Sequence, residues 1–210
     1  MSEVLLDSQA VPTNPSAGQV LIYPATSTKR LTTSDENGKD LTSPPLTNAN
    51  TADVSAPSVD TYVTNSNLAI PAHLLQVGTT FRWRFYITKT AAGVATPIWV
   101  VRVGTLGTTG DAARLTFTQV ALQTAAVDAA VVEIDAVLRN TGAAGVLAGG
   151  LRMNHVLAAT GFSTLTMNVQ QVTSAGFDTT VASTIVGVSV NPGALGVWTI
   201  QVVSAELLGV

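Results

Sequence analysis

The sequence predicts an all-β protein: a jelly-roll-like β-sandwich of about eight strands, preceded by an extended N-terminal arm that carries a short β-hairpin. The first observation is strict alternation of apolar and polar residues after position 78, as in the stretch Phe81 to Phe85. A period of two residues is the period of a strand. The second is that turns rich in Gly, Asn and Thr separate the alternating segments. The third is that helix signals are weak throughout, so little helix is expected.

The composition changes near Pro57, which predicts two parts. Residues 1–57 are rich in Ser, Thr, Asn, Asp and Pro, whereas residues 58–210 are rich in Val, Ala, Thr, Leu and Gly. A polar segment of the first kind buries too little apolar surface to offset the entropy lost on ordering. We therefore predict an attachment arm over 1–57 and a sandwich over 58–210.

A hairpin is predicted within residues 18–42 of the arm. Its first strand would contain three apolar residues, Val20, Ile22 and Tyr23. Its second strand would run over 29–33, and Asn37-Gly38 supplies a tight-turn signal. A ribbon of this size is marginal alone in water, so it needs a partner surface or a copy of itself.

The sandwich strands follow in order from the alternation and the turn signals between them. The predicted strands are 79–88, 98–103, 114–120, 130–139, 150–157, 163–172, 184–190 and 197–205. No repeat of 20–50 residues is visible, which argues against a propeller or a solenoid.

The bulk composition excludes several classes of protein. Charged residues make up 11% of the chain and hydrophobic residues 46%, against about 25% charged residues in an ordinary soluble domain. The net charge of −3 gives no electrostatic reason to expect a nucleic-acid partner. Without cysteine, disulfides and thiolate metal sites cannot form. No apolar run reaches about 18 residues and no export signal is visible, so neither a membrane span nor secretion is expected.

Candidate catalytic residues are few, and each has a simpler structural explanation. His73 and His155 are the two histidines; a base or metal ligand is conceivable, but no triad spacing accompanies them, so hydrogen bonds to the backbone are expected. Glu133 and Asp135 lie two apart on a predicted strand, about 7 Å from each other on one face. A glycosidase pair could have that distance, but a polar outer face is the favoured interpretation.

Two loops and a group of arginines resemble binding motifs incompletely. "SDENGKD" (34–40) lacks the spacing of a calcium loop, and a hairpin turn is favoured. "GTLGTTG" (104–110) lacks the Lys-Ser/Thr ending of a phosphate loop and precedes a strand, so an ordinary loop is expected. Four arginines fall near predicted core tryptophans, and alternation turns them outward to solvent or another subunit: Arg82, Arg84, Arg102 and Arg114, beside Trp83 and Trp99.

Several predicted strands are apolar on both faces, which in a monomer would leave apolar patches exposed. We therefore expect some of these side chains to contact neighbouring subunits or the attachment partner. The candidate contact residues are Val20, Ile22, Tyr23, Ile98, Val100, Val131, Val137, Ile185, Leu207 and Leu208.

Two stretches resemble parts of virion proteins of tailed bacteriophages. "PSAGQVLIYPATSTKRLTTSDENGKDLT" resembles a short module of such proteins, with matching residues Gly18, Val20, Tyr23, Lys29, Asp35 and Gly38. "LAIPAHLLQVGTTFRWRFY" resembles the lead-in to phage jelly-roll domains, where Gly78 and Thr79 match the turn. The chain departs from the module at Pro24, which would end the first strand early.

The resemblance implies a structural protein of the virion, such as a head fibre, a capsid decoration protein or a small tail-fibre component, usually trimeric. It carries no catalytic residues, cofactor or metal to this chain. It implies a homotrimer, attached through residues 1–57 to other virion proteins after assembly in the host cytoplasm, with no nucleic-acid or membrane partner.

Three alternatives stay open. The sandwich could recognise a host glycan or receptor through loops 104–113 and 174–183, in which Phe177 is the sole aromatic residue. It could be an enzyme such as a capsule depolymerase, although no convincing acid pair is present. It could also be a matrix or pilus-like subunit, which would normally need an export signal.

Overall fold

The protein is described by a computed structural model, which covers residues 21–24, 31–34, 46–71, 75–165, 167–181 and 183–208. The chain divides into two units, Met1–Pro45 and Leu46–Val210. Each unit is described by itself.

The first unit contains a two-stranded antiparallel sheet. Strand β1 (Leu21–Pro24) pairs with β2 (Leu31–Ser34), and Tyr23 stands opposite Thr32. Two strands of the predicted hairpin are therefore present, and Pro24 closes the first one, where its missing N–H costs least. Residue Val20 and the Asn37-Gly38 turn lie outside the described residues.

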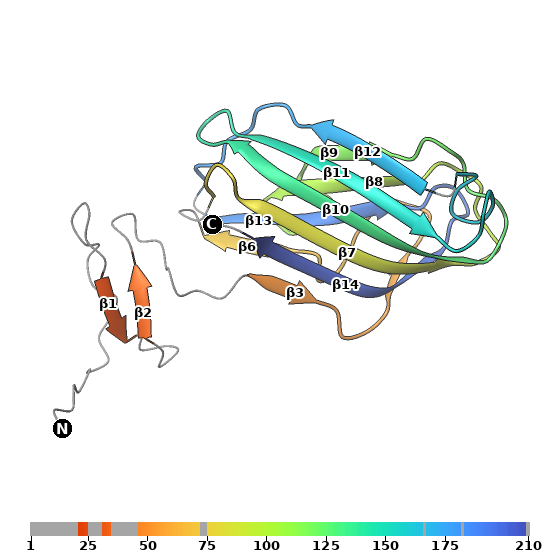
Figure 1. Cartoon of the computed structure of the whole chain (residues 1–210), viewed down its shortest axis with the longest axis horizontal. Helices are drawn as coiled ribbons and strands as arrows, with labels where there is room; N and C mark the ends of the chain where they lie inside the picture. The colour runs from red at the N-terminus through yellow and green to blue at the C-terminus, as the bar shows by residue number, and fades with distance from the viewer. Residues whose placement is uncertain are drawn as a thin grey trace, which may run out of the picture. The chain divides into compact units, whose positions relative to one another are not determined.

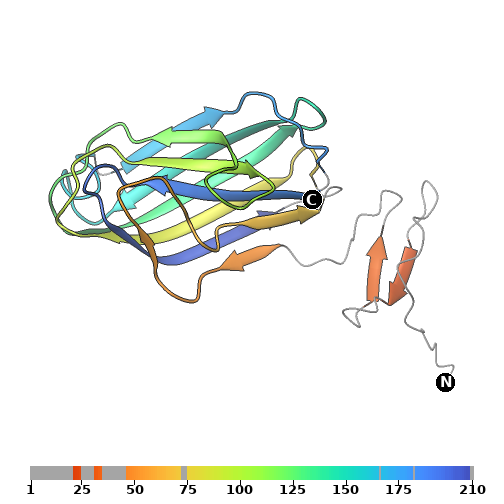
Figure 2. The same cartoon turned by 180° about the vertical axis from the view of Figure 1, so that it is seen from behind.

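The second unit is a β-sandwich of two antiparallel sheets, which confirms the predicted fold class (Figures 1 and 2). Its strands are β3 (Thr47–Ala49), β4 (Val54–Ala56), β5 (Thr61–Tyr62), β6 (Leu68–Pro71), β7 (Thr80–Lys89), β8 (Ile98–Gly104), β9 (Ala112–Thr118), β10 (Asp128–Asn140), β11 (Val146–His155), β12 (Met167–Thr173), β13 (Ser183–Asn191) and β14 (Trp198–Leu208). In the described residues no helix is long and apolar enough to cross a membrane.

The larger sheet has the strand order β12-β11-β10-β7-β14-β3, with β4 also pairing with β14. The smaller sheet has the order β5-β13-β8-β9, with β6 also pairing with β13. The chain crosses to the smaller sheet for β8 and β9 between β7 and β10, which are neighbours in the larger one. The short strands β3 to β6 raise the strand number above the expected eight.

The core lies between the sheets and is built around three tryptophans, Trp83, Trp99 and Trp198, none of which is exposed. The rings of Phe85 and Trp99 stack with centroids 5.0 Å apart, and Phe162 meets Trp198 edge-on at 5.0 Å. Aromatic pairs in such geometries contribute about 0.5–1.5 kcal/mol beyond the area that they bury. Strict alternation along β7 and β10 supplies these inward side chains, as the sequence predicts.

A β-bulge in β14 changes which residues face the core. The register slips between Ile200 and Val202, so Ile200 and Val203 both point inward and Leu207 is 2% exposed. Leu207 therefore fills the core of its own chain, which corrects its assignment as a contact residue. Asn50 completes the bulge, since its side chain donates to the Gln201 carbonyl at 3.0 Å and accepts from the Val203 amide at 2.7 Å.

The unit boundary lies earlier than the predicted one at residue 57, because residues 46–56 belong to the sandwich. Strands β3 and β4 both pair with β14. Ala56 is 1% exposed and Leu46 packs against the core. The segment is polar in composition because its strands are short and half of each faces solvent. The average composition of residues 1–57 therefore did not reveal that residues 46–56 belong to the larger sheet.

The boundary yields a test with two truncations. A chain that begins at Leu46 keeps β3 and β4, so we expect it to unfold at the same urea concentration as the full chain, within error. A chain that begins at Ser58 loses the pairing of β14 with β3 and β4 and the bulge contacts of Asn50, which we expect to cost at least about 2 kcal/mol. Equal stability of the two truncated chains would contradict the placement of residues 46–56.

Candidate functional site

A trough lies on the outer face of the larger sheet, along β11. Its floor is formed where Gly150 carries no side chain and Ala148 carries one methyl group. One part of the trough has a volume of about 570 Å³ and the adjoining part about 310 Å³; both border Asp135, Gly150 and Gln171. A trough forms here because side chains on the neighbouring strands are longer.

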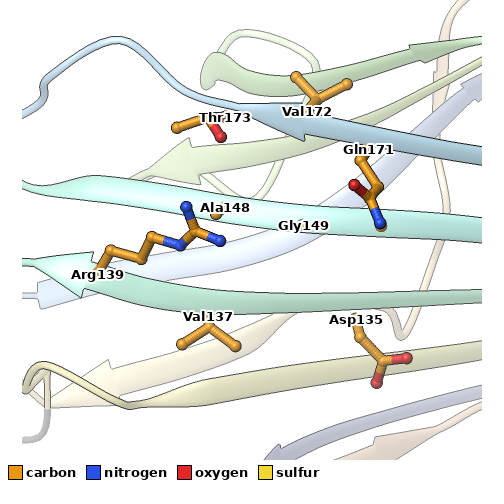
Figure 3. Close-up of a pocket in the computed structure, with 9 residues that line it drawn as sticks. Asp135, Val137, Arg139, Ala148, Gly149, Gln171, Val172 and Thr173 are labelled. Carbon is orange, nitrogen blue, oxygen red and sulfur yellow. The ribbon is translucent and has the colours of Figure 1, made fainter.

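The walls of the trough come from β10 on one side and β12 on the other (Figure 3). Asp135, Val137 and Arg139 stand on the β10 side, and Gln171 and Thr173 on the β12 side. The wall is thus mixed, with one carboxylate, one guanidinium, an amide, a hydroxyl and an apolar group. Such a lining can bind an extended chain by hydrogen bonds and apolar contact.

Ion pairs cross the sheet beside the trough. Arg82 donates to Asp135 at 2.9 Å, and Glu133 accepts from Arg84 at 2.7 Å and from Arg152 at 2.6 Å. Hydrogen bonds from Arg152 and Arg84 hold the pKa of Glu133 below its usual value. Glu133 is therefore held as a carboxylate, the opposite of what a general acid requires. Because these pairs are largely exposed to solvent, they contribute little to stability and mainly set the arrangement of charge.

Apolar side chains flank these ion pairs on the same face. The most exposed are Val169 (57%), Met167 (54%), Val202 (43%), Tyr86 (42%) and Val137 (36%). Strand β12 is the edge of the sheet, has no charged residue and no proline, and pairs with β11 without a register shift. Proteins usually protect a long edge strand with charge, proline or a bulge. This combination is typical of a surface that another chain covers.

The predicted contact residues do not gather in one place. On the large-sheet face lie Val131, which is half-buried, and Val137; the smaller sheet holds Ile98, Val100 and Ile185. Val100 is 7% exposed, so it is covered by its own chain.

Of the remaining predicted contacts, Ile22 and Tyr23 lie in β1, and Leu208 is half-buried beside the buried Leu207. Sequence reasoning missed the exposed β12 residues Met167 and Val169. The sequence signal that could have identified them is the absence of charged residues from this predicted strand. Such a strand at the edge of a sheet needs another chain to cover it.

His155 makes one contact with the backbone, as its sequence context predicts, and also pairs with the Asp128 carboxylate, which the sequence analysis did not predict. Its imidazole is fully buried; Nδ1 lies 2.8 Å from the Asp128 carboxylate and Nε2 lies 2.6 Å from the Leu165 carbonyl. Asp128 also accepts hydrogen bonds from the backbone amides of Leu157 and Phe162. Both ring nitrogens are thus occupied and no serine hydroxyl contacts them in the described residues. His73 lies outside the described residues.

Lys89 is buried beside the same cluster. Its ammonium donates to the carbonyls of Gly93, Thr124 and Gly161, at 3.2, 2.5 and 3.3 Å. Desolvation lowers the pKa of this lysine, and the charge of Asp128 opposes the effect. Lys89 joins three loops at one end of the sandwich, so its role is structural.

The 104–110 loop binds an anion, and that anion is a side chain of the protein. The Asp111 carboxylate accepts from the amides of Thr105, Leu106 and Gly107 at 3.1, 3.0 and 2.7 Å. Asp111 is 5% exposed, which leaves no room for a phosphate. The interpretation of this segment as an ordinary loop is therefore correct.

The part of the chain that the structure describes holds no group of three or more His, Asp or Glu side chains placed to bind a metal. The 34–40 stretch lies outside the described residues apart from Ser34, the last residue of β2.

No protein-family model and no curated protein matches the chain. Among the solved structures with a weak likeness to the chain are two of infectious bursal disease virus. The Gx strain structure is 15% identical, covers 94% of this chain and 50% of that chain, and has a TM-score of 0.25. The Gt strain structure is 12% identical and has a TM-score of 0.24. The match covers 94% of this chain and 48% of the viral chain. The chain spans about half the length of these viral chains, and a likeness this weak carries no argument.

Two adjacent glycines test the geometry of the trough. A Cβ on Gly149 would lie 2.6 Å from Leu115 Cδ1 and 2.8 Å from the Asp135 carbonyl oxygen, whereas a Cβ on Gly150 would meet nothing closer than 3.5 Å. We therefore expect Gly149→Ala to destabilise the protein by about 1–3 kcal/mol, and Gly150→Ala to change stability by less than about 0.5 kcal/mol. Urea unfolding measures both. The reverse order would mean that β11 presents its other face to solvent.

Proposed function

We propose that this chain is a non-enzymatic structural protein of a virus particle, of the tailed-bacteriophage kind. In this proposal it is a trimeric capsid decoration or head-fibre subunit, located in the virion. The observation that carries the proposal is the outer face of the larger sheet, where a trough and exposed apolar residues lie beside an uncharged edge strand. Such a face favours contact with another protein over chemistry on a small molecule.

The chemistry of the described residues supports a role in assembly. The two carboxylates on the sheet, Glu133 and Asp135, are neutralised by arginines within the same face. A partner that covers this face would therefore bury charges that are already paired, which lowers the desolvation cost of association. The surrounding valines and Met167 supply apolar area for the contact.

A trimer requires a contact between two different patches of neighbouring copies, because its rotation relates head to tail. The edge strand β12 of one copy and the larger sheet's outer face of the next provide such a pair. The first unit, residues 1–45, would serve as the tether to another virion protein. The sequence resemblance in residues 15–42 supports this division.

A charge placed on the edge strand tests the assembly face. Val169→Asp places a carboxylate where the next copy would pack, so we expect the subunit dissociation constant to rise at least tenfold, which corresponds to about 1.4 kcal/mol. Light scattering of the purified full chain measures the mass. Val120→Asp is the matched control, since Val120 is 78% exposed and follows β9 in the smaller sheet. A wild-type mass equal to one chain would refute the proposal of an oligomer.

Attachment can be tested separately from folding. The chain that begins at Leu46 should fail to bind particles assembled without this protein, whereas the full chain should co-sediment with them. A peptide of residues 1–45 should compete with the full chain. If the shortened chain decorates particles equally well, the tether does not lie in residues 1–45.

The alternative function is that of a tail-fibre or receptor-binding protein that recognises a host glycan or receptor. One observation favours it, namely a cavity lined by Thr105, Asp178 and Thr184, among others, in which the Arg114 guanidinium makes no hydrogen bond or ion pair with a described residue. The two roles are compatible, because the cavity lies outside the proposed assembly face.

A further inference from the structure

Arg114 occupies a position that departs from the alternation of its strand. The pairing of β8 with β9 slips between Val101 and Arg102, so that Val101 faces Leu115 and Arg102 faces Ala113. Arg114 is the extra residue of this β-bulge. Bulges are frequent beside binding sites, where they redirect a side chain.

The guanidinium of Arg114 is held in place by stacking. Its central carbon lies 4.7 Å from the centroid of the Phe177 ring. Phe177 is fixed in turn by two backbone hydrogen bonds with Gly145, at 2.7 and 2.9 Å. Arg114 makes no hydrogen bond or ion pair with any described residue, and its Nε is buried without an acceptor. The cation is therefore pre-oriented by an aromatic ring, while its charge is not neutralised by a protein carboxylate.

The surroundings of Arg114 form a cavity of about 180 Å³, lined by residues of the three strands β8, β9 and β13 and of two loops. This volume is below the ~300–1,000 Å³ of sites for drug-sized ligands, and suits a single sugar ring. Thr105 and Thr184 bring hydroxyl groups to the lining, and Asp178 brings a carboxylate.

Asp178 has a defined role in this cavity. Its Oδ1 accepts from the backbone amide and the hydroxyl of Thr180, at 2.8 and 2.7 Å. These hydrogen bonds lower the pKa of Asp178, so the group is an anion and an acceptor at neutral pH. A ligand that offered an anion alone would pair with Arg114 but would be repelled by Asp178. A ligand with a carboxylate and neighbouring hydroxyls would satisfy both side chains.

We propose that this cavity binds a carboxylated monosaccharide unit of the uronic acid class. The sugar carboxylate pairs with the Arg114 guanidinium, and ring hydroxyls donate to Asp178 and exchange hydrogen bonds with Thr105 and Thr184. Charge-assisted pairing of this kind, with a planar fork of donors, is the strong component of the site. The assignment is independent of the assembly role, so that failure of one leaves the other standing.

The test is a titration of the full chain with glucuronate, glucose and acetate, followed by amide chemical shifts in NMR. We expect saturable binding of glucuronate in the millimolar range, with glucose and acetate at least tenfold weaker. The shifts should concentrate at Thr105, Phe177 and Thr184 and leave Gly150 unchanged. The proposal would be overturned if glucuronate bound no more tightly than glucose. It would also be overturned if the amide shifts were centred on residues outside the cavity. Acetate equal to glucuronate would also overturn it, because the cavity would then recognise a carboxylate of any source, such as that of a protein.

Variants separate the guanidinium from its surroundings. Arg114→Met should abolish glucuronate binding, and Asp178→Asn should reduce the preference for glucuronate over acetate. Asp53→Asn is the matched control for Asp178→Asn, since Asp53 is also exposed but does not line the cavity. It should bind like the wild type. Retained glucuronate binding in Arg114→Met would refute the proposal. If that variant does not fold, the positions of the wild-type amide shifts on glucuronate binding still test the proposal.

Discussion

Packing of large aromatic side chains between two sheets is the constraint on which the rest of the structure depends. Three buried tryptophans and their phenylalanine neighbours fix the inward face of β7, β8 and β14. Because side chains alternate along a strand, fixing the inward face also fixes the outward one. The arginines and carboxylates of β7 and β10 therefore stand in register on the outside, where they pair across strands. The outer face is thus a consequence of the core.

At the ends of the sandwich, buried backbone groups of the loops need hydrogen-bond partners. Asp111 and Asp128 accept hydrogen bonds from loop amides, and Lys89 donates to loop carbonyls. Each buried charge replaces water for several backbone groups at once. In a chain with 11% charged residues, using some of them internally leaves fewer on the surface. The surface accordingly depends on threonine, serine and glutamine for its polarity, and part of it stays apolar.

Sequence reasoning recovered what the two-residue period determines and missed what depends on single residues. The strands from β7 onward and the inward tryptophans follow from alternation. Strands β3 and β4 were missed because three residues are too few to show a period. Leu207 was assigned to a contact surface because the predicted strand ended at residue 205; β14 continues to Leu208, and its bulge at Gln201 turns Leu207 to the inward face, a shift that no composition rule signals. The trough was missed for a related reason, since Gly149 and Gly150 look alike in sequence but face opposite sides of β11.

The arrangement of the two proposed binding regions has a structural logic. The trough and the edge strand β12 belong to the larger sheet, whereas Arg114 and Thr184 project from strands of the smaller sheet. The cavity shares no lining residue with the trough, so a neighbour that covered the trough would not have to occupy the cavity. The bulge that redirects Arg114 also costs little, because it lies on the edge strand β9, where one side of the ladder is already unpaired. Assembly and ligand recognition can therefore be carried by one sandwich without competing for the same surface.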